Sequence, residues 1–263
     1  MNFGFGGLSE IALIFMIILL LFGPKEVPHL FKQAARMFAK VKVYTDKIKN
    51  QLDEVIKSDQ AKTFYESESV KRKDPIRDRY KTARDALTLD ARKEKSEAIA
   101  RLLYETPQYK DARAIMIYAS IGAEVETRHM IAEMLKTGKR VVLPFCKENP
   151  QELGIGEIAD FEKDTVPGVF GIPEPVERVR GNFFKSDLGL ILCPAVAFDI
   201  YGARLGHGKG YYDMFLKEVR GRIPLFGLAF DCQIHQQNLP FDYHDVPMDQ
   251  VITENGLLLS KEA

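Results

Sequence analysis

Hydrophobic residues are distributed unevenly along the chain, and the densest group lies near its start. Residues 11–22, IALIFMIILLLF, form an unbroken apolar run. The run is apolar on every helical face, no Lys or Arg precedes it, and no small-x-small cleavage site follows it. These features favour a short transmembrane helix over a buried core helix or a cleaved signal peptide. Gly23-Pro24 ends the helix because proline lacks a backbone donor, so residues 1–24 are predicted to contain it.

Residues 25–57 show a different pattern, in which mostly apolar positions from Val27 to Val55 recur at alternating spacings of four and three. This period is typical of a helix that packs against a partner helix. The segment also holds eight basic and four acidic residues, which suits an anionic membrane surface. We expect an amphipathic helix for membrane contact, self-association or binding of other subunits, rather than one packed on the downstream domain. The excess of Lys and Arg in this segment is expected to stay in the cytoplasm, so the N-terminus is expected outside.

Residues 58–72 are polar and charged without periodicity, so a linker is expected there. From residue 73 to residue 263, helical patterns alternate with short apolar runs. The expected strands lie at 114–119, 140–145, 188–193 and 225–230. The expected helices lie at 77–104, 127–135 and 211–219. This alternation predicts one α/β domain with a mostly parallel sheet and flanking helices, a Rossmann-like three-layer arrangement.

Composition and charge narrow the class of function. The chain has 263 residues with 37 basic and 37 acidic side chains, so its formal net charge is zero. Zero net charge argues against broad nucleic-acid binding, and the average composition excludes a collagen-like, disulfide-rich or wholly disordered chain. Cys146, Cys193 and Cys232 lie far apart without metal-ligand spacing, so reduced thiols in a cytoplasmic setting are expected.

The residues best placed for chemistry follow the expected strand at 188–193. There the segment GHGKG, residues 206–210, stands between Arg204 and the expected helix at 211–219. Ligands of such folds bind beyond the carboxyl ends of strands, and closely spaced glycines before a helix N-terminus suit an anion. The segment is neither a Walker A loop nor a GxGxxG motif. From the residues alone, a phosphate site and a tight strand–helix turn are equally open interpretations.

The N-terminal segment carries a recognisable arrangement. Gly6-Gly7-Leu8-Ser9-Glu10 precedes the apolar run, and Phe22-Gly23-Pro24-Lys25 follows it. Together with the amphipathic helix, these residues resemble the TatA/TatB family of the twin-arginine protein translocase over about the first 50–60 residues. An acidic residue at position 10 is closer to the TatB-like pattern. The resemblance implies a membrane segment with translocase relatives, while the simpler interpretation is that this part is only an anchor.

The domain from residue 73 carries several long blocks in a fixed order. They are LTLDARKEKSEAI from Leu87, YASIGAEVET from Tyr118, GIPEP from Gly171, PAVAFDIYGARLGHGKGYYD from Pro194, GLAFDCQ from Gly227 and LPFDYHDVPMDQVITE from Leu239. These blocks resemble the 5-formyltetrahydrofolate cyclo-ligase (methenyltetrahydrofolate synthetase) family, with Ala195 standing where that family has glycine. The resemblance implies that ATP phosphorylates the formyl oxygen of 5-formyltetrahydrofolate and that 5,10-methenyltetrahydrofolate, ADP and phosphate are released.

The resemblance also implies roles for residues at the ATP. The ATP site would contain Lys73, Arg77, Arg204, Leu205, Gly206, His207, Gly208, Lys209, Gly210, Tyr211 and Tyr212. Of these, Arg204, Lys209 and Tyr211 would be catalytic, because phosphoryl transfer needs positioning and charge neutralisation rather than a protein nucleophile. Without the family, Lys73 and Arg77 also fit a solvated basic helix face, and Tyr212 also fits core packing.

The folate and the metal ion have their own implied residues. The folate site would contain Ala119, Glu124, His207, Gly208, Lys209, Gly210 and Tyr211. Glu124 would accept paired hydrogen bonds from the amino-pyrimidine edge of the pterin, although it also fits a cap or a surface charge before the next helix. Mg²⁺ would bind Asp213 and Asp245, since this ion takes few carboxylates besides water and phosphate oxygens. The alternatives are a helix-terminal charge for Asp213 and a solvated loop position for Asp245.

Two functions from different classes follow. The first is a single-pass inner-membrane protein with its N-terminus outside and a cytoplasmic cyclo-ligase domain that uses ATP and Mg²⁺ on 5-formyltetrahydrofolate. The second is a twin-arginine translocase component whose C-terminal domain is inactive or a passenger. Intact candidate residues for both ATP and Mg²⁺ favour the first function. No nucleic-acid partner is expected.

Overall fold

The computed structural model describes residues 59–147, 152–242 and 244–259. The expected transmembrane helix at 1–24 and amphipathic helix at 25–57 lie outside these residues. Within the described ranges, no helix combines the length and the apolar character that a bilayer crossing requires. The chain divides into two compact units, Met1–Glu66 and Ser67–Ala263, and the second unit carries the sheet and the candidate site.

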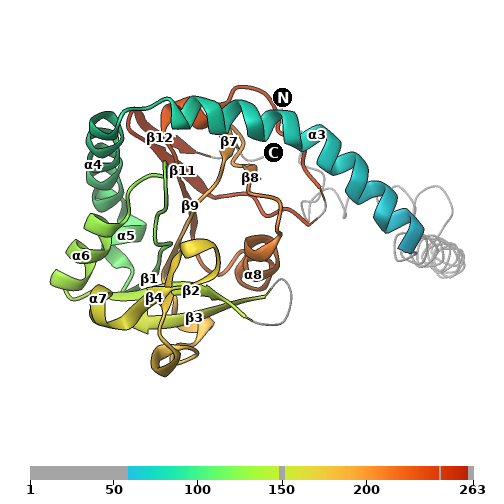
Figure 1. Cartoon of the computed structure of the whole chain (residues 1–263). Helices are drawn as coiled ribbons and strands as arrows, with labels where there is room; N and C mark the ends of the chain where they lie inside the picture. The colour runs from blue at the N-terminus through green and yellow to red at the C-terminus, as the bar shows by residue number, and fades with distance from the viewer. Residues whose placement is uncertain (1–58, 148–151, 243, 260–263) are drawn as a thin grey trace, which may run out of the picture. The chain divides into compact units, whose positions relative to one another are not determined.

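A seven-stranded sheet with the strand order β12-β11-β9-β6-β1-β2-β3 forms the centre of the second unit (Figure 1). Its strands are β1 (Ala114–Met116), β2 (Arg140–Cys146), β3 (Leu153–Ile158), β6 (Leu190–Cys193), β9 (Leu225–Leu228), β11 (Gln250–Thr253) and β12 (Gly256–Leu259). The strands from β11 to β2 run parallel, whereas the edge strands β12 and β3 are antiparallel to their neighbours. The expected α/β fold is confirmed, as a mixed sheet with a parallel centre.

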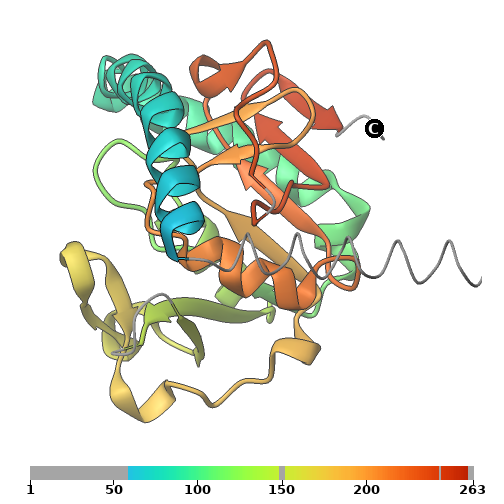
Figure 2. The same ribbon diagram turned by 90° about the vertical axis from the view of Figure 1, so that its right-hand side faces the viewer.

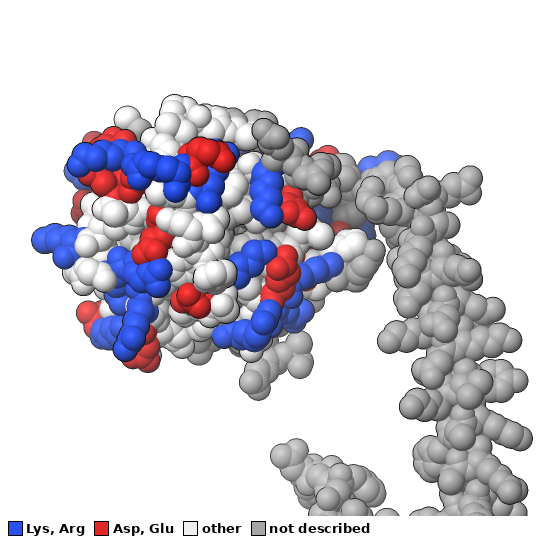
Figure 3. All heavy atoms as spheres, turned by 90° about the horizontal axis from the view of Figure 1, so that it is seen from below, with Lys and Arg blue, Asp and Glu red and all other residues white. Residues whose placement is uncertain are grey.

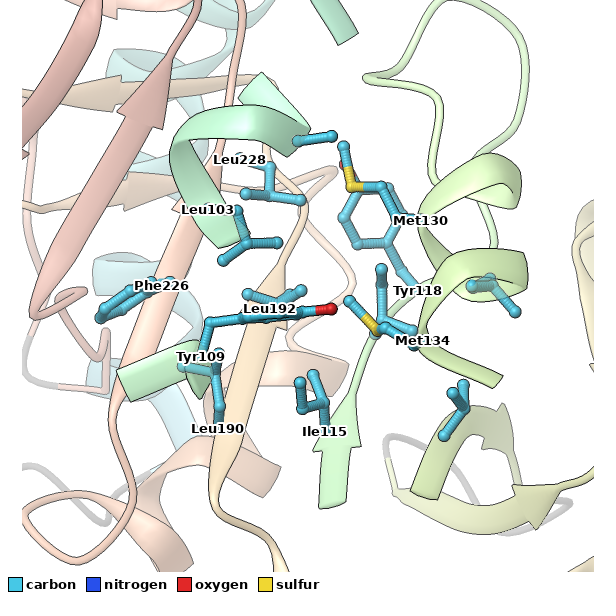
Figure 4. Close-up of a cluster of buried hydrophobic side chains, with 14 of the residues drawn as sticks. Leu103, Tyr109, Ile115, Tyr118, Met130, Met134, Leu190, Leu192, Phe226 and Leu228 are labelled. Carbon is cyan, nitrogen blue, oxygen red and sulfur yellow. The ribbon is translucent and has the colours of Figure 1, made fainter. Parts of the chain in front are cut away.

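Helices cover both faces of this sheet. One face packs against α4 (Leu89–Glu105), α5 (Pro107–Asp111) and α6 (Arg128–Lys136), and the other against α8 (Tyr211–Val219). Successive strand residues point to opposite faces, so Ile115 belongs to the core under α4–α6 while Met116 belongs to the core beside α8. Figure 4 shows the first core, where side chains of α4, α5 and α6 converge on those of the strands. Because the sheet is buried on both faces, the sequences of its central strands are continuous apolar runs.

The N-terminal part of the described chain differs from expectation. α3 runs from Asp59 to Asp85, so the segment expected as a linker at 58–72 is helical from Asp59 onward. The single helix expected at 77–104 is also wrong, because α3 ends at Asp85 and α4 begins at Leu89. Thr88 caps the new helix by accepting a hydrogen bond from the Ala91 amide at 3.2 Å. Residues 59–73 are rich in helix-forming Lys, Glu, Gln and Ala, and they form a helix without the apolar stripe that periodicity detects.

Short elements complete the unit. A three-stranded sheet has the order β10-β7-β8, and a two-stranded one pairs β4 with β5. Their bounds are β4 (Thr165–Pro167), β5 (Pro173–Pro175), β7 (Ala197–Asp199), β8 (Arg204–Leu205) and β10 (Ile234–His235). The short helix α7 spans Phe161–Asp164, and 3₁₀ turns lie at Val169–Gly171, Glu177–Val179, Lys185–Asp187 and Asp231–Gln233. The strands expected at 114–119 and 225–230 are shorter in the structure, because their last residues leave the sheet as connecting loops.

Charged side chains of both signs share the surface. On the face seen in Figure 3, basic and acidic side chains are interspersed rather than gathered into fields of one sign. This pattern matches the formal net charge of zero.

Candidate active site

The glycine-rich segment lies directly before α8, as the sequence indicates, but it follows β8, a short strand that the sequence did not predict, rather than the strand expected at 188–193. Gly208 and Gly210 have φ angles of 88° and 71°, a left-handed backbone that glycine adopts without a steric penalty. A Cβ on Gly208 would lie 3.3 Å from an Arg77 guanidinium nitrogen, and one on Gly206 would lie 3.1 Å from Arg204. The glycines therefore let the backbone approach two guanidinium groups closely. We call residues Arg204–Tyr212 the glycine-rich loop below.

Within the glycine-rich loop, the side chains divide into exposed and buried groups. His207 and Lys209 are exposed, and Lys209 makes no hydrogen bond or ion pair with any other residue in the described part of the chain. Leu205 is only 2% exposed and packs against Val196 and Tyr80. Its carbonyl accepts the Val196 amide at 2.8 Å. Lys209 is therefore available to a ligand, while the Leu205 side chain belongs to the core.

Helix α3 brings one basic residue to the glycine-rich loop and a second to the segment after Leu239, each from more than 120 residues away in sequence. Arg77 donates from Nε to the Gly206 carbonyl at 2.9 Å. Lys73 is 6% exposed, and its Nζ lies 2.7 Å from carboxylate oxygens of both Asp242 and Asp245. The interpretation of this pair as a solvated basic face is wrong, because both side chains turn inward to the site.

Arg204 and Asp213 form the second ion pair of the site. The Arg204 Nη2 donates to Asp213 Oδ1 at 2.5 Å, and the arginine is 8% exposed. Burial by itself lowers the pKa of Arg204, but the Asp213 carboxylate outweighs it and the net shift of the pKa is upward. The Arg204 guanidinium carbon lies 5.4 Å from the centre of the Tyr212 ring, and burial raises the pKa of Tyr212 well above its ordinary value. Arg204 therefore stays charged and Tyr212 stays neutral at any physiological pH.

The loop after β1 reaches the same place from the other side. The Glu124 Oε1 lies 3.6 Å from His207 Nε2, and its Oε2 accepts the Ile121 amide at 3.1 Å. Ala119, which precedes this loop, is 5% exposed. The structure thus places Glu124, expected on the folate side, next to the glycine-rich loop.

Tyr211 connects the glycine-rich loop to the end of β2. It lies near the Cys146 thiol, whose pKa is raised by burial and by the Glu174 carboxylate and lowered to a smaller extent by Tyr211. The ring of Tyr211 also packs against the core beside α8. Tyr211 is therefore held in place by this packing.

The two carboxylates expected to bind Mg²⁺ are each paired with a basic residue. Asp213 Oδ1 contacts Arg204, and Asp245 Oδ2 contacts Lys73 and the Asp242 amide at 2.9 Å. The other oxygen of each carboxylate has no hydrogen bond with another described residue. In the described ranges, no three His, Cys, Asp or Glu side chains are grouped as a metal site. This donor set fits an ion that keeps most of its ligands as water and phosphate oxygens.

Three residues of or near the site were missed by sequence reasoning. Asp242 shares Lys73 with Asp245. Asp199 is 2% exposed and accepts amides of Tyr201, Ala203 and Leu239 at 2.8–2.9 Å. Arg84 is a buried arginine on α3. All three lie in or beside the quoted sequence blocks, but only their burial and partners distinguish them from ordinary polar residues.

A separate cavity of about 700 Å³ lies beside α5 and the amino-terminal ends of β9 and β11. None of the residues that line it belongs to the glycine-rich loop, to α3 or to the Glu124 loop. The chemistry expected from the sequence therefore lies elsewhere than this cavity.

Comparison with known proteins decides which chemistry this geometry serves. Residues 69–254 match the model of the 5-formyltetrahydrofolate cyclo-ligase family. The chain belongs to this family. Residues 3–51 match the model of the mttA/Hcf106 family, which covers TatA-, TatB- and TatE-type sequences. Both resemblances found in the sequence are thereby confirmed.

Individual cyclo-ligase relatives agree with the family match. A probable 5-formyltetrahydrofolate cyclo-ligase of Caenorhabditis elegans is 30% identical over 196 residues, covering 71% of this chain and 95% of that protein. The 5-formyltetrahydrofolate cyclo-ligase of Escherichia coli K12 is 31% identical to this chain, and the alignment covers 65% of this chain and 93% of that protein. The structure of 5,10-methenyltetrahydrofolate synthetase from Aquifex aeolicus superposes with a TM-score of 0.63 at 32% identity, covering 73% of this chain and 94% of that one. The expected enzyme class, an ATP-dependent ligase, is confirmed.

Proposed function

We propose that the domain closes the ring of 5-formyltetrahydrofolate at the glycine-rich loop, with ATP as co-substrate. The γ-phosphoryl group of ATP passes to the formyl oxygen, and ADP leaves. Nitrogen 10 of the folate then attacks the activated formyl carbon, and the carbon–oxygen bond breaks to release phosphate. The product is 5,10-methenyltetrahydrofolate. The observation that supports this proposal best is the meeting of Arg77, Arg204 and Glu124 at one loop of a chain from the cyclo-ligase family.

The residues of the loop supply positioning and positive charge. Lys209 is exposed and unpaired among the described residues, so it is free to approach the transferred phosphoryl group. Arg77 and Arg204 are fixed beside the loop glycines, which lets backbone N–H groups and guanidinium groups surround the phosphate chain. Fixed donors aimed at developing charge are the main source of catalysis in phosphoryl transfer. Tyr211, packed against the core beside α8, lies where ATP and folate would meet.

Asp213 and Asp245 would hold Mg²⁺ through the oxygens that their basic partners leave open. The ion would neutralise negative charge on the phosphates. Arg204 and Lys73 keep these two carboxylates oriented before any ligand arrives. Asp242 provides Lys73 with a second carboxylate, so this lysine keeps a partner when Asp245 binds the metal ion.

Residues 1–57 would tether this enzyme to the inner membrane, with the N-terminus outside and the catalytic domain in the cytoplasm. The match of residues 3–51 to the mttA/Hcf106 family supports a membrane segment. The same match favours a second candidate function, a translocase component that carries the ligase domain as a passenger. An active ligase domain together with a failure to support translocation in cells lacking the native small subunits would leave only the anchor role.

Turnover of the purified full chain tests the proposed reaction. One ADP should form for each methenyl product, which its absorbance reports, and omission of ATP should abolish the product. Removal of Mg²⁺ with a chelator should have the same effect and should be reversed by adding the ion back. Product formation without ATP, or no product with both ligands present, contradicts the assignment.

A further inference from the structure

Helix α3 presents a stripe of three basic residues toward the domain. Lys73, Arg77 and Arg84 are separated by four and seven residues, spacings that return to the same helical face. Lys73 pairs with Asp242 and Asp245, and Arg77 donates to Gly206. The first two members of the stripe are therefore explained by the site.

Arg84 has no comparable partner. It is 7% exposed, and its Nε and Nη1 are buried without a hydrogen-bond acceptor. The nearest carboxylate, Asp85 Oδ1, lies 3.6 Å from Nε and belongs to a side chain that is 61% exposed. That distance is too long for a hydrogen bond. Two of the three guanidinium nitrogens are thus desolvated and unsatisfied.

Such an arrangement is unfavourable unless a ligand completes it. An arginine side chain in a protein does not become neutral by losing its proton. Buried polar groups in native proteins almost always have a hydrogen-bond partner. A buried charge without one destabilises the fold by more than a neutral polar group would. The structure therefore points to an acceptor that arrives with a ligand.

The position of Arg84 places this acceptor on the folate side. Seven residues of helix separate Arg84 from Arg77, a rise of about 10 Å. The loop between β1 and α6 lies beside this end of α3 in both Figure 1 and Figure 2. The burial of Tyr118, which lies in that loop, raises the pKa of its phenol, Glu124 raises this pKa further, and the charge of Arg84 lowers it. Arg84 and Glu124 therefore act on the same phenol.

We propose that Arg84 is a substrate-binding residue that donates hydrogen bonds to the 4-oxo group of the pterin ring. This inference rests on the proposed placement of folate at Glu124. A carboxylate at Glu124 would take the amino group and the ring N–H of the pterin, and the oxo group is the acceptor adjacent to that ring N–H. Glu124 would then accept hydrogen bonds from the amino group and the ring N–H, and Arg84 would donate to the neighbouring oxo group. These three groups together form one edge of the pterin ring.

The decisive variant is Arg84→Met, which removes the charge and keeps an unbranched apolar side chain. Binding of 5-formyltetrahydrofolate to the full chain, titrated without ATP, should weaken about 10- to 100-fold, as expected for loss of charged hydrogen bonds. Binding of ATP should change less than twofold. The thermal midpoint of the free variant should equal or exceed that of the parent, because an unsatisfied buried charge is gone. Arg101→Met, at an exposed position of α4, is the matched control and should change none of these quantities.

Three results would overturn the inference. One is a folate affinity within twofold of the parent. Another is a lower thermal midpoint with equal weakening of folate and ATP, which would make Arg84 a structural residue. The third is a normal affinity of Arg84→Met for a 5-formyl pterin that lacks the glutamate tail, which would assign Arg84 to the tail carboxylates. Glu124→Gln tests the placement of folate separately, since unchanged folate binding in that variant would contradict the proposed site itself.

Discussion

At the scale of single residues, the site is organised by buried ion pairs whose members lie far apart in the sequence. Lys73 and Asp245 are 172 positions apart and 2.7 Å apart in space. Removing one member of such a pair leaves the other desolvated and unpaired, which costs more than the pair contributes. Substitutions here therefore affect folding as well as turnover, and the two effects are separated only by measuring both.

Asp213→Asn provides one such test. The amide keeps the size and can still accept from Arg204, but it removes the negative charge that balances this buried arginine. We expect the free energy of unfolding to fall by about 1–3 kcal/mol while the protein stays folded, and Mg²⁺-dependent turnover to collapse. Urea unfolding and the Mg²⁺ concentration for half-maximal activity measure the two effects. Asp187→Asn, at an exposed position, is the control, and an unchanged Mg²⁺ dependence in Asp213→Asn would remove Asp213 from the metal site.

Lys209→Met should behave differently, because Lys209 is exposed and has no partner among the described residues. Stability should be unchanged, while kcat should fall about 100- to 1,000-fold through loss of a charge that acts on the transferred phosphoryl group. Steady-state kinetics measure the change in kcat, and thermal unfolding measures the stability of the variant. Lys93→Met, at another exposed position, should leave kcat as it is. Near-normal turnover in Lys209→Met would show that this lysine does not act on the phosphates.

At the scale of elements, Asp199 joins two segments that the site requires together. Its Oδ1 holds the turn before Arg204 through the Tyr201 and Ala203 amides, and its Oδ2 holds the Leu239 amide. The segment that follows Leu239 carries Asp242 and Asp245, and the Met248 amide returns to Gly202 at 2.8 Å. One buried carboxylate thus fixes the glycine-rich loop relative to the carboxylates that contact Lys73.

Asp199→Asn should loosen both segments at once, since an amide nitrogen would face either the Leu239 amide or the two turn amides. Hydrogen exchange should accelerate in residues 200–206 and 238–246 while the central strands stay protected. The KM for ATP should rise more than the KM for 5-formyltetrahydrofolate. Faster hydrogen exchange in only one of the two segments would show that Asp199 does not couple them.

At the scale of the whole molecule, the chain combines a cyclo-ligase domain with a segment of the mttA/Hcf106 family. The apolar stretch from Leu8 to Phe22 would span about 22 Å as a helix, less than the roughly 30 Å of a hydrocarbon core. Local thinning of the bilayer or oligomerisation can meet such a mismatch, and the repeat from Val27 to Val55 would offer a surface for self-association if it forms the expected helix.

We therefore expect the full chain to fractionate with membranes as an oligomer. Deletion of residues 1–57 should release an active enzyme into the soluble fraction, because every candidate site residue lies at or beyond Lys73. Carbonate extraction followed by sedimentation analysis measures both properties. Recovery of the intact chain wholly in the soluble fraction would contradict the anchor.

The sequence by itself determined the larger pattern of the molecule. Apolar runs marked the central strands because the sheet is buried on both faces, and the position of GHGKG placed the glycine-rich loop directly before the helix that the structure has as α8. The ordered blocks were enough for the family. The first part of helix α3, before Arg77, was not predicted because it forms from polar residues that create no apolar stripe. Without the family resemblance, Lys73 and Arg77 therefore also fitted a solvated basic face.

Only the tertiary structure decided which charged residues meet. Crossovers between strands bring α3, the glycine-rich loop and the segment after Leu239 together, and sequence spacing contains no record of that approach. Burial and partners then separate residues of one chemical type: Arg204 is paired, Arg77 binds a carbonyl, and Arg84 is left unsatisfied. The physical reason is that the effect of a charge depends on the water and counter-charges around it, and these are set by the fold.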